Sequence, residues 1–451
     1  MTDTSAITHL GEQHRGQARM AYRLAAAHGN RLMYVHRVGW HVWDGARWAE
    51  DQHGAAKQAV LEVLRAALGE SLGDKELRTD VRRCESAAGV AGVLDLAAAL
   101  EPFAHTVADL DADPYLLNCA NGTLDLRTMQ LRTQDPADRI TKVTRAAYRP
   151  ERGNGQTWAQ FLERVLPDPE VRGFLQRLAG VGLLGKVVEH VLAILTGTGA
   201  NGKSVFYKAL GHALGDYATV AEPDLFMHRD GAHPTGEMDL RGVRWVVVSE
   251  SDKDRRLAEA TMKRLTGGDP IRARRMRQDF VQFDPSHTAA LVTNHLPKVS
   301  GDDPAIWRRL RVVPFGVVIP EDEQDVHLDE QLQLDADAVL TWAVAGYHDY
   351  TQHGLAEPDA VKAATAKYQT DSDAIARFLA DCCLINPHMY ITTGEAFERW
   401  VTWAADDGTE PISSKAFGEA LDRRGHPTTK SNGRRVRRGL GLLTDDQEED
   451  Q

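Results

Sequence analysis

Long apolar stretches are missing from this chain of 451 residues, and none approaches the roughly 20 residues that a membrane-spanning helix needs. The first residues, MTDTSAITHLGEQ, lack the basic and then apolar order of a secretion signal. Cysteine is scarce, and its four copies, at positions 84, 119, 382 and 383, form no C-x-x-C pair. These absences disfavour a membrane partner and a zinc ribbon, and we expect a protein of the reducing cytoplasm of a bacterium or a phage-infected cell.

The charge of the chain is negative overall but unevenly distributed. A net charge of −12 argues at first against a nucleic-acid partner. However, the segments IRARRMR (271–277) and KSNGRRVRR (430–438) are concentrated basic patches, whereas the tail TDDQEEDQ is acidic. Because global charge mainly governs solubility, a local basic channel can still attract a phosphodiester backbone.

The stretch LTGTGANGKSVF (195–206) has the spacing G-x-x-x-x-G-K-S, which is typical of a phosphate-binding loop. An apolar run at 191–196 predicts a buried strand before it, and apolar residues at helical spacing predict a helix from Lys203 to a stop at Gly215. Loop amides and the helix N-terminus would hold the phosphates of ATP, Lys203 would reach the β- and γ-phosphates, and the Ser204 hydroxyl would ligate Mg²⁺. The predicted nucleotide-binding residues are Gly197, Thr198, Gly199, Ala200, Asn201, Gly202, Lys203, Ser204 and Val205.

Two further strands are expected to end in polar side chains beside this loop. RWVVVSESD (244–252) is a buried strand that ends in Glu250, our candidate for holding Mg²⁺ and orienting the attacking water, with Asp252 as a residue that could share the role. AALVTN (289–294) ends in Asn294, which could contact the γ-phosphate or the lytic water. An acid or an amide at a strand end also has an ordinary structural interpretation.

The segment DDPAIWRRLRVVPF (302–315) carries two adjacent arginines behind the expected ATPase core. Such arginines can neutralise the transition-state charge of a neighbour's ATP in trans, and Arg309 is the first choice for this role and Arg308 the second. The alternative is an ordinary surface arginine. A finger acting in trans requires a head-to-tail interface, and such interfaces close into rings.

KRLTGGDPIRARRMRQDFVQF (263–283) predicts an extended hairpin with a dense basic side. If it projects into a ring, its arginines would grip a single-stranded backbone. The alternative is a solvated, salt-bridged edge hairpin, and Arg274 could instead face a subunit interface. The predicted contacts to nucleic acid are Arg272, Arg274, Arg275 and Arg277, followed by Phe280.

Without repeats or low-complexity linkers, the length predicts about two or three domains, and three regions are visible: 1–150, 151–333 and 334–451. The first is α+β, with hairpins expected at 33–51, turning at Asp44-Gly45, and at 121–132. The last contains the helices 394–406, with Phe397, Trp400 and Val401 facing a small core, and 413–425. A basic wing follows and turns at Asn432-Gly433; Lys430, Arg434 and Arg435 would contact duplex phosphates, unless the unit docks a protein.

Five blocks in order, GTGANGKS, VVVSESD, KRLTGGDPIRARRMRQDFVQFDP, TNHLP and AIWRRLRVVPF, resemble superfamily 3 helicases, and more narrowly the helicase region of phage and plasmid primase–helicases related to the poxvirus-type NTPase. The resemblance extends to YLLNCANGTLDLRTMQLR and GLAEPDAVKAATAKYQTDSDAIARFL and covers most of the chain from about residue 20. It implies an α/β fold: an AAA+-like P-loop core, a parallel sheet flanked by helices, between an α+β N-terminal domain and a C-terminal winged-helix-like domain.

The same resemblance implies an ATP-driven hexameric ring that translocates on single-stranded DNA and unwinds duplex during replication. It implies Lys203 and Ser204 at the phosphates, Glu250 as the Walker B acid, Asn294 as sensor and Arg309 as finger. SESD departs from the expected pattern by its serine, and nothing resembles a polymerase-like primase domain or zinc module. We therefore expect a separate primase or polymerase as a partner.

Two other functions fit the sequence. One is a replication initiator or loader that binds and melts an origin without processive unwinding, and the other is an NTPase of defence or regulation that DNA triggers. A motor should hydrolyse ATP faster with single-stranded DNA and displace long strands, whereas an initiator should need a specific duplex.

Overall fold

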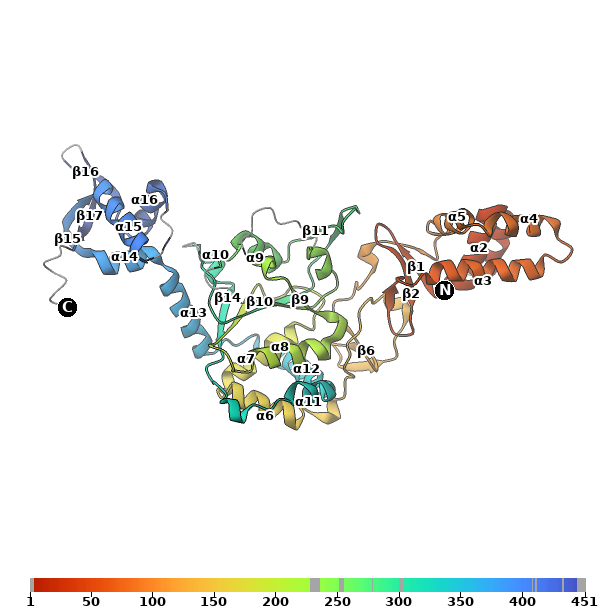
Figure 1. The fold of residues 1–451 in the computed structure, drawn as a ribbon, viewed down its shortest axis with the longest axis horizontal. Helices are drawn as coiled ribbons and strands as arrows, with labels where there is room; N and C mark the ends of the chain where they lie inside the picture. The colour runs from red at the N-terminus through yellow and green to blue at the C-terminus, as the bar shows by residue number, and fades with distance from the viewer. Residues whose placement is uncertain are drawn as a thin grey trace.

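A computed structural model describes residues 4–227, 236–250, 255–277, 279–299, 303–407, 409, 412–431 and 434–443. Figure 1 shows an N-terminal helical unit, a central unit built around a sheet, and a C-terminal unit on the opposite side, to which helix α13 (Asp359–Ser372) leads. The fold is mixed α/β, with helices on both faces of the central sheet.

The central sheet is parallel throughout and has the strand order β14-β8-β13-β10-β9. Its strands are β8 (Leu192–Thr196), β9 (Ala218–Ala221), β10 (Trp245–Glu250), β13 (Thr288–Thr293) and β14 (Leu310–Pro314). In register, Ile194 lies beside Leu291 and Val312. Because these strands are parallel and adjacent, the carboxyl ends of β8, β10 and β13 meet at one edge of the sheet. The strands expected at 191–196, 244–252 and 289–294 are thereby confirmed as neighbours.

Alternate residues of the strands enter two separate apolar cores, as expected of a sheet buried on both faces. One core contains Leu195, Val247 and Val313, and the other contains Ile194, Val248 and Val312. The first core also holds side chains of α6 (Gln156–Val165), α7 (Pro169–Val181), α8 (Lys203–Leu214) and α12 (Ala336–His353). The second holds side chains of α9 (Glu259–Leu265), α10 (Pro304–Trp307) and the antiparallel hairpin of β11 (Ile271–Ala273) and β12 (Val281–Phe283).

Helices α7 and α12 approach each other so closely that glycine is needed at the contact. A Cβ atom on Gly180 would lie 2.1 Å from the Tyr347 backbone nitrogen, and one on Gly346 would lie 2.0 Å from the Gln176 carbonyl oxygen. Helix α12 therefore belongs to the core of the central unit by its packing. The core also includes Leu117 and Leu124, so that it extends across residues 150 and 333, where the sequence suggested domain boundaries.

The N-terminal unit combines a helical bundle with two small sheets. Its helices are α1 (Thr4–Glu12), α2 (Gly16–His28), α3 (Ala55–Glu70), α4 (Lys75–Cys84) and α5 (Ala87–Ala97). One sheet has the order β3-β2-β1-β4, from β1 (Leu32–Val35), β2 (Gly39–Trp43), β3 (Trp48–Glu50) and β4 (Ala104–His105). The β2–β3 hairpin turns at Asp44-Gly45 as expected, and β1 adds a second hairpin that the sequence did not reveal. The other sheet, β5 (Leu116–Cys119), β6 (Gly122–Asp125) and β7 (Gln130–Arg132), contains the hairpin expected at 121–132.

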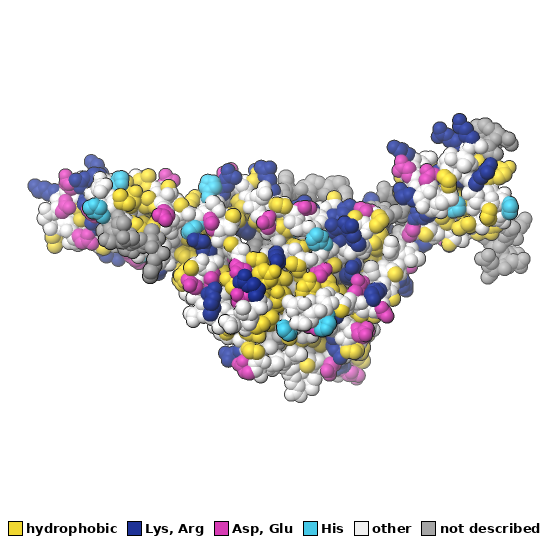
Figure 2. All heavy atoms as spheres, turned by 180° about the vertical axis from the view of Figure 1, so that it is seen from behind, with side chains coloured by type: hydrophobic (Ala, Val, Ile, Leu, Met, Phe, Trp, Pro, Cys, Tyr) yellow, Lys and Arg dark blue, Asp and Glu magenta, His cyan; other side chains and the backbone are white. Residues whose placement is uncertain are grey.

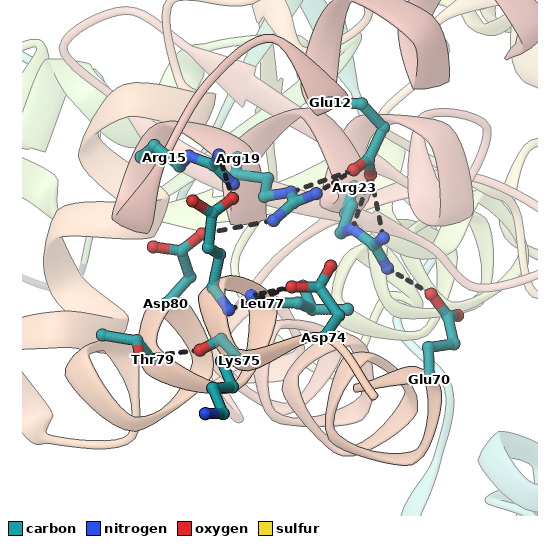
Figure 3. Close-up of polar contacts among 11 residues, drawn as sticks. Glu12, Arg15, Arg19, Arg23, Glu70, Asp74, Lys75, Leu77, Thr79 and Asp80 are labelled. Atoms are coloured by element: carbon teal, nitrogen blue, oxygen red, sulfur yellow. Dashed lines mark hydrogen bonds and ion pairs between the residues drawn. The ribbon is translucent and has the colours of Figure 1, made fainter. Parts of the chain in front are cut away.

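A network of ion pairs joins the helices of this bundle (Figure 3). Arg19, on α2, is 6% exposed and pairs with Glu12 of α1 and with Asp80 of α4, to which its Nη1 is 3.4 Å distant. Arg23, one turn further, binds Glu12 at 2.8 Å and Glu70 of α3 at 2.6 Å. Because these guanidinium groups link four helices, the bundle is a unit with its own buried polar contacts as well as its own apolar core.

The C-terminal unit contains α14 (Ala374–Cys382), α15 (Thr393–Asp407), α16 (Ser414–Arg423) and a sheet of order β15-β17-β16, from β15 (Cys383–Thr392), β16 (Thr428–Ser431) and β17 (Arg434–Leu442). Ser413 caps α16 by accepting a bond from the Ala416 amide, as expected. Trp400 is buried, but Val401 is 37% exposed, so the prediction that Val401 faces the core is wrong. Val401 lies one position after Trp400, which rotates its side chain by about 100° around the helix and away from the buried face. The expected turn at Asn432-Gly433 lies outside the described residues.

Replacing Gly180 by alanine should disrupt the α7–α12 contact and destabilise the core by roughly 1–3 kcal/mol, because the added methyl group meets backbone atoms. Gly69, on α3, is a matched control, since a Cβ atom there meets nothing within 4 Å. Gly69→Ala should be neutral or stabilise its helix by about 0.5–1 kcal/mol. Hydrogen exchange of the α7 and α12 amides measures the effect; equal protection in the two variants would contradict the close packing.

Candidate functional site

The phosphate-binding loop lies between β8 and α8, as the sequence predicts, and its backbone is largely left-handed. Gly199, Ala200 and Gly202 have φ values of 109°, 47° and 82°. Gly197 is required for a different reason, because a Cβ atom there would lie 2.2 Å from Asn201 Nδ2 and 2.4 Å from the Phe315 carbonyl oxygen. These conformations curl residues 197–202 around the N-terminus of α8, where backbone amides can bind an anion.

Lys203 is the buried cation of this loop. Its side chain is held by three neutral oxygens: Nζ donates to the Gly197 carbonyl at 2.8 Å, to Asn201 Oδ1 at 3.0 Å and to Asn294 Oδ1 at 3.2 Å. Lys203 is 5% exposed, and burial lowers the pKa of its ammonium group. A buried cation whose hydrogen-bond acceptors are all uncharged favours binding of an anion nearby.

Asn294 follows β13 directly and is brought to the loop by the sheet register. Thr293 forms a local turn, in which its Oγ1 accepts from the His295 amide at 3.1 Å and donates to the His295 carbonyl at 2.6 Å. The structure thus brings together Lys203 and Asn294, two of the predicted catalytic residues, although they lie far apart in the sequence.

Glu250 ends β10, and its backbone is paired in register with Thr293 on the neighbouring strand. Nothing is described of its side chain, and Asp252 lies outside the described residues. Ser249, which precedes Glu250 on β10, lines the same cavity as the phosphate-binding loop, whereas the serine that follows Glu250 lies outside the described residues.

A cavity of about 550 Å³ adjoins the loop. One wall is α6, which contributes Thr157, Gln160, Phe161 and Arg164, residues spaced to share one helix face. Another wall is the segment from Ile319 to Gln331, which is fixed to the loop by a bond from the Ile319 amide to the Ala200 carbonyl at 2.8 Å. An ion pair between Arg164 and Glu323 joins the two walls. The sequence did not reveal these walls, since neither carries a motif.

The residues at the loop fit a magnesium–nucleotide complex better than a bare metal. Among the described residues no cluster of three or more His, Cys, Asp or Glu side chains could hold a metal ion. Ser204 is exposed at the start of α8 and lines the cavity. Since Mg²⁺ is usually held by one or two side chains together with substrate phosphates, the Ser204 hydroxyl is a suitable donor.

The two candidate finger arginines differ in their surroundings. Arg309 is half-buried, and its Nη1 donates to the Ala305 carbonyl of α10 at 2.8 Å. Arg308 is exposed. Arg308, the second choice for the finger, is therefore more accessible than Arg309, the first choice.

The four arginines of the β11–β12 hairpin fall into different environments. Arg272 and Arg274 lie over the ring of Phe280, at 4.9 and 4.6 Å from its centroid. Arg275 is engaged by Glu50 of β3, so it is not a free phosphate contact in this structure. Arg277 is exposed, with a φ of 62°.

In the predicted wing, β16 and β17 pair in antiparallel register, with Lys430 opposite Arg435. Both side chains are exposed, whereas the Arg434 side chain is not described. Lys and Arg side chains also gather along the upper edge of the C-terminal unit in Figure 2. The buried Arg437 differs from these, since it donates to the His426 carbonyl and pairs with Asp422 of α16.

Comparison with known proteins gives two family matches. Residues 21–167 match a family described as D5 N terminal like, and residues 195–309 match a family of unknown function, DUF5906. The chain is 28% identical over 296 residues to "Putative helicase L207/L206" of Acanthamoeba polyphaga mimivirus. This match covers 60% of this chain and 31% of that protein. It is 29% identical over 235 residues to "Putative helicase 184R" of Invertebrate iridescent virus 6, and this match covers 49% of this chain and 24% of that protein.

A protein of African swine fever virus named as a "Putative primase" is 23% identical over 211 residues, covering 45% of this chain and 22% of that protein. The chain thus spans about a third or less of the length of these relatives. Among solved structures, the NrS-1 C terminal region aligns over 91% of this chain and 96% of its own, with 9% identity and a TM-score of 0.47. In the described part of the chain, no helix is long and apolar enough to cross a membrane.

Replacing Gly197 by alanine should weaken nucleotide binding, because the methyl group would displace Asn201 and with it one of the oxygens that hold Lys203. Titration with a fluorescent ATP analogue should show a Kd raised at least about tenfold. Gly316→Ala, in the adjacent segment, is the control, since its methyl group meets nothing within 4 Å. Wild-type affinity in Gly197→Ala would refute the assignment of the loop.

Proposed function

We propose that this chain, which is related to the D5-type and poxvirus-type NTPases of the primase–helicase group, is the ATP-dependent motor of a replicative DNA helicase. One observation carries the proposal: Lys203 and Asn294 meet at the head of α8, beside an open cavity and at the carboxyl edge of a parallel sheet. That is the arrangement of a nucleoside triphosphatase site. The relatives named as helicases and primases come from large DNA viruses and support a role in replication.

In this proposal the phosphates of ATP lie in the curl of residues 197–202, and Lys203 moves from its three neutral oxygens to the β- and γ-phosphates. Bound Mg²⁺ neutralises charge on the phosphate oxygens, and Ser204 and Glu250 are the residues that would hold it. Glu250 also orients the attacking water, and Asn294 contacts the γ-phosphate. The nucleoside end occupies the cavity between α6 and the segment 319–331.

The neighbouring subunit completes the site in a homo-oligomeric ring, for which six subunits is our proposal. Arg308 is the better candidate for the arginine finger, because its side chain is exposed whereas that of Arg309 is directed back toward α10. The β11–β12 hairpin would contact single-stranded DNA in the ring, and the exposed cations of the wing would contact forked or origin duplex. A separate primase or polymerase would supply primers.

A second function, an initiator that binds and melts an origin, is favoured by one feature. The C-terminal unit presents Lys430 and Arg435 together on a two-stranded wing, an arrangement suited to duplex phosphates. Strand displacement over long duplexes favours the motor, and a requirement for one duplex sequence favours the initiator.

Lys203→Ala should abolish ATP hydrolysis while leaving the fold intact, because residues 197–204, all of them described, contain no other cation. The wild-type chain should hydrolyse ATP faster when a single-stranded oligonucleotide is added, and a phosphate-release assay measures both effects. Normal hydrolysis by Lys203→Ala would refute the site. A rate of ATP hydrolysis that does not change when single-stranded DNA is added would argue against the motor.

Subunits carrying Arg308→Ala and subunits carrying Glu250→Gln, each inactive alone, should regain part of the ATPase activity when mixed. The reason is that an intact site then forms where a Glu250-bearing subunit meets an Arg308-bearing neighbour. Arg309→Ala, tested in the same way, decides between the two arginines. Failure of both arginine variants to complement Glu250→Gln in fully mixed oligomers would exclude a finger in this segment.

A further inference from the structure

The arginine hairpin is packed against the N-terminal sheet. Arg37, in the turn between β1 and β2, donates from Nη1 to the Phe280 carbonyl at 3.3 Å. Val38 and Val107 of the N-terminal unit pack against the apolar cluster that contains Ile271 and Val281 of the hairpin. The hairpin and the turn after β1 therefore form one continuous surface.

Glu50, the last residue of β3, lies at the centre of this surface between two arginines. Its Oε2 accepts from Arg275 Nη1 at 2.8 Å, and its Oε1 accepts from Arg275 Nη2 at 3.1 Å and from Arg241 Nη2 at 2.8 Å. Burial alone would raise the pKa of Glu50, but the bonds from Arg275 and the charges of both arginines lower it, so the carboxylate stays charged. Two oxygens that accept from a fork of Arg275 and from a second guanidinium form an arrangement that the two free oxygens of a phosphodiester can also satisfy.

The surroundings of Glu50 are mainly positive. Arg37 and Arg277, from the N-terminal sheet and the hairpin, are exposed, and Arg272 and Arg274 cover the Phe280 ring. Met276, next to Arg275, is 79% exposed. Asp239 is a nearby negative group whose charge acts on Arg275, and Asp279, next to Phe280, is an exposed acid on the hairpin. One carboxylate thus occupies the middle of a cationic surface that two distant parts of the chain contribute.

The N-terminal sheet does not depend on Glu50 for its position. The Trp48 amide donates to the Ile140 carbonyl at 2.9 Å, and Asn118 Nδ2 donates to the Ala46 carbonyl at 2.9 Å. Arg47 also forms an ion pair with Asp216 of the core. Loss of the Glu50–Arg275 contact would therefore release the hairpin arginine without undocking the sheet.

We propose that the β11–β12 hairpin and the N-terminal sheet together form the surface for the backbone of single-stranded nucleic acid, and that Glu50 holds the place of one phosphate until the strand displaces it. This inference rests on the proposed function, because it takes the hairpin as the nucleic-acid contact. The Arg275 side chain is 44% exposed and the Glu50 side chain 27%, so solvent reaches this ion pair, and an ion pair at the surface is worth only about 0–1 kcal/mol. A polyanion that releases counterions can therefore replace the carboxylate. Glu50 then competes with a phosphate of the nucleic acid for the Arg275 guanidinium group.

The test is the affinity of the full chain for a fluorescein-labelled oligo-dT, measured by anisotropy over a range of salt concentrations. Glu50→Gln keeps the shape of the side chain and removes its charge, so it should bind the oligonucleotide about three- to tenfold more tightly, with a steeper dependence on salt. Arg275→Ala should bind more weakly than the wild type. In the Arg275→Ala background, Glu50→Gln should change the affinity for the oligonucleotide only slightly, because the two residues act on the same phosphate.

Glu70→Gln is the matched control: Glu70 also pairs with an arginine, Arg23, but within the helical bundle, and its loss should leave oligonucleotide binding unchanged. Nucleotide binding and circular dichroism verify that each variant is folded. A folded Glu50→Gln whose affinity is unchanged or lower overturns the competitor role while the proposed function stands. A wild-type chain that shows no salt-dependent binding of the oligonucleotide overturns both.

Discussion

The ammonium group of Lys203 is the point at which the loop after β8 and the end of β13 meet, and the candidate site depends on it. It is buried, its pKa is lowered by burial, and its three acceptors are neutral oxygens from the loop and from the next strand of the sheet. Each acceptor has a structural cause: Gly197 leaves room for Asn201, and the parallel register places Asn294 beside the loop. The protein thus keeps a desolvated positive charge in position before any anion arrives.

The surroundings of this charge come from segments that are distant in the sequence. Helix α6 precedes the loop and the segment 319–331 follows the sheet, yet both line the cavity. Helix α12 packs into the same core through Gly346. At the other edge, the N-terminal sheet joins the β11–β12 hairpin through Arg37 and Glu50. The cavity and the hairpin are therefore coupled to the rest of the chain by direct packing.

What could be predicted from the sequence was local. The strand–loop–helix of residues 192–214, the hairpin of 271–283 and the capped helix after Ser413 follow from spacing, turn residues and capping preferences, all of which act over a few positions. The partners of the hairpin arginines could not be predicted, since Glu50 lies 225 positions from Arg275 and one acid among many gives no signal. The same holds for Arg309, whose inward direction depends on α10, and for α12, whose place in the core depends on a backbone contact.

The central claim is that one subunit binds ATP and its neighbour completes the site, so the most direct measurement is the mass of the particle in solution. Mass photometry of the purified chain, alone and with a non-hydrolysable ATP analogue and a single-stranded oligonucleotide, reports this without any variant. We expect a shift to a closed oligomer of defined subunit number when both ligands are present. A particle of 49.8 kDa that stays monomeric under all conditions while hydrolysing ATP at its full rate would contradict it.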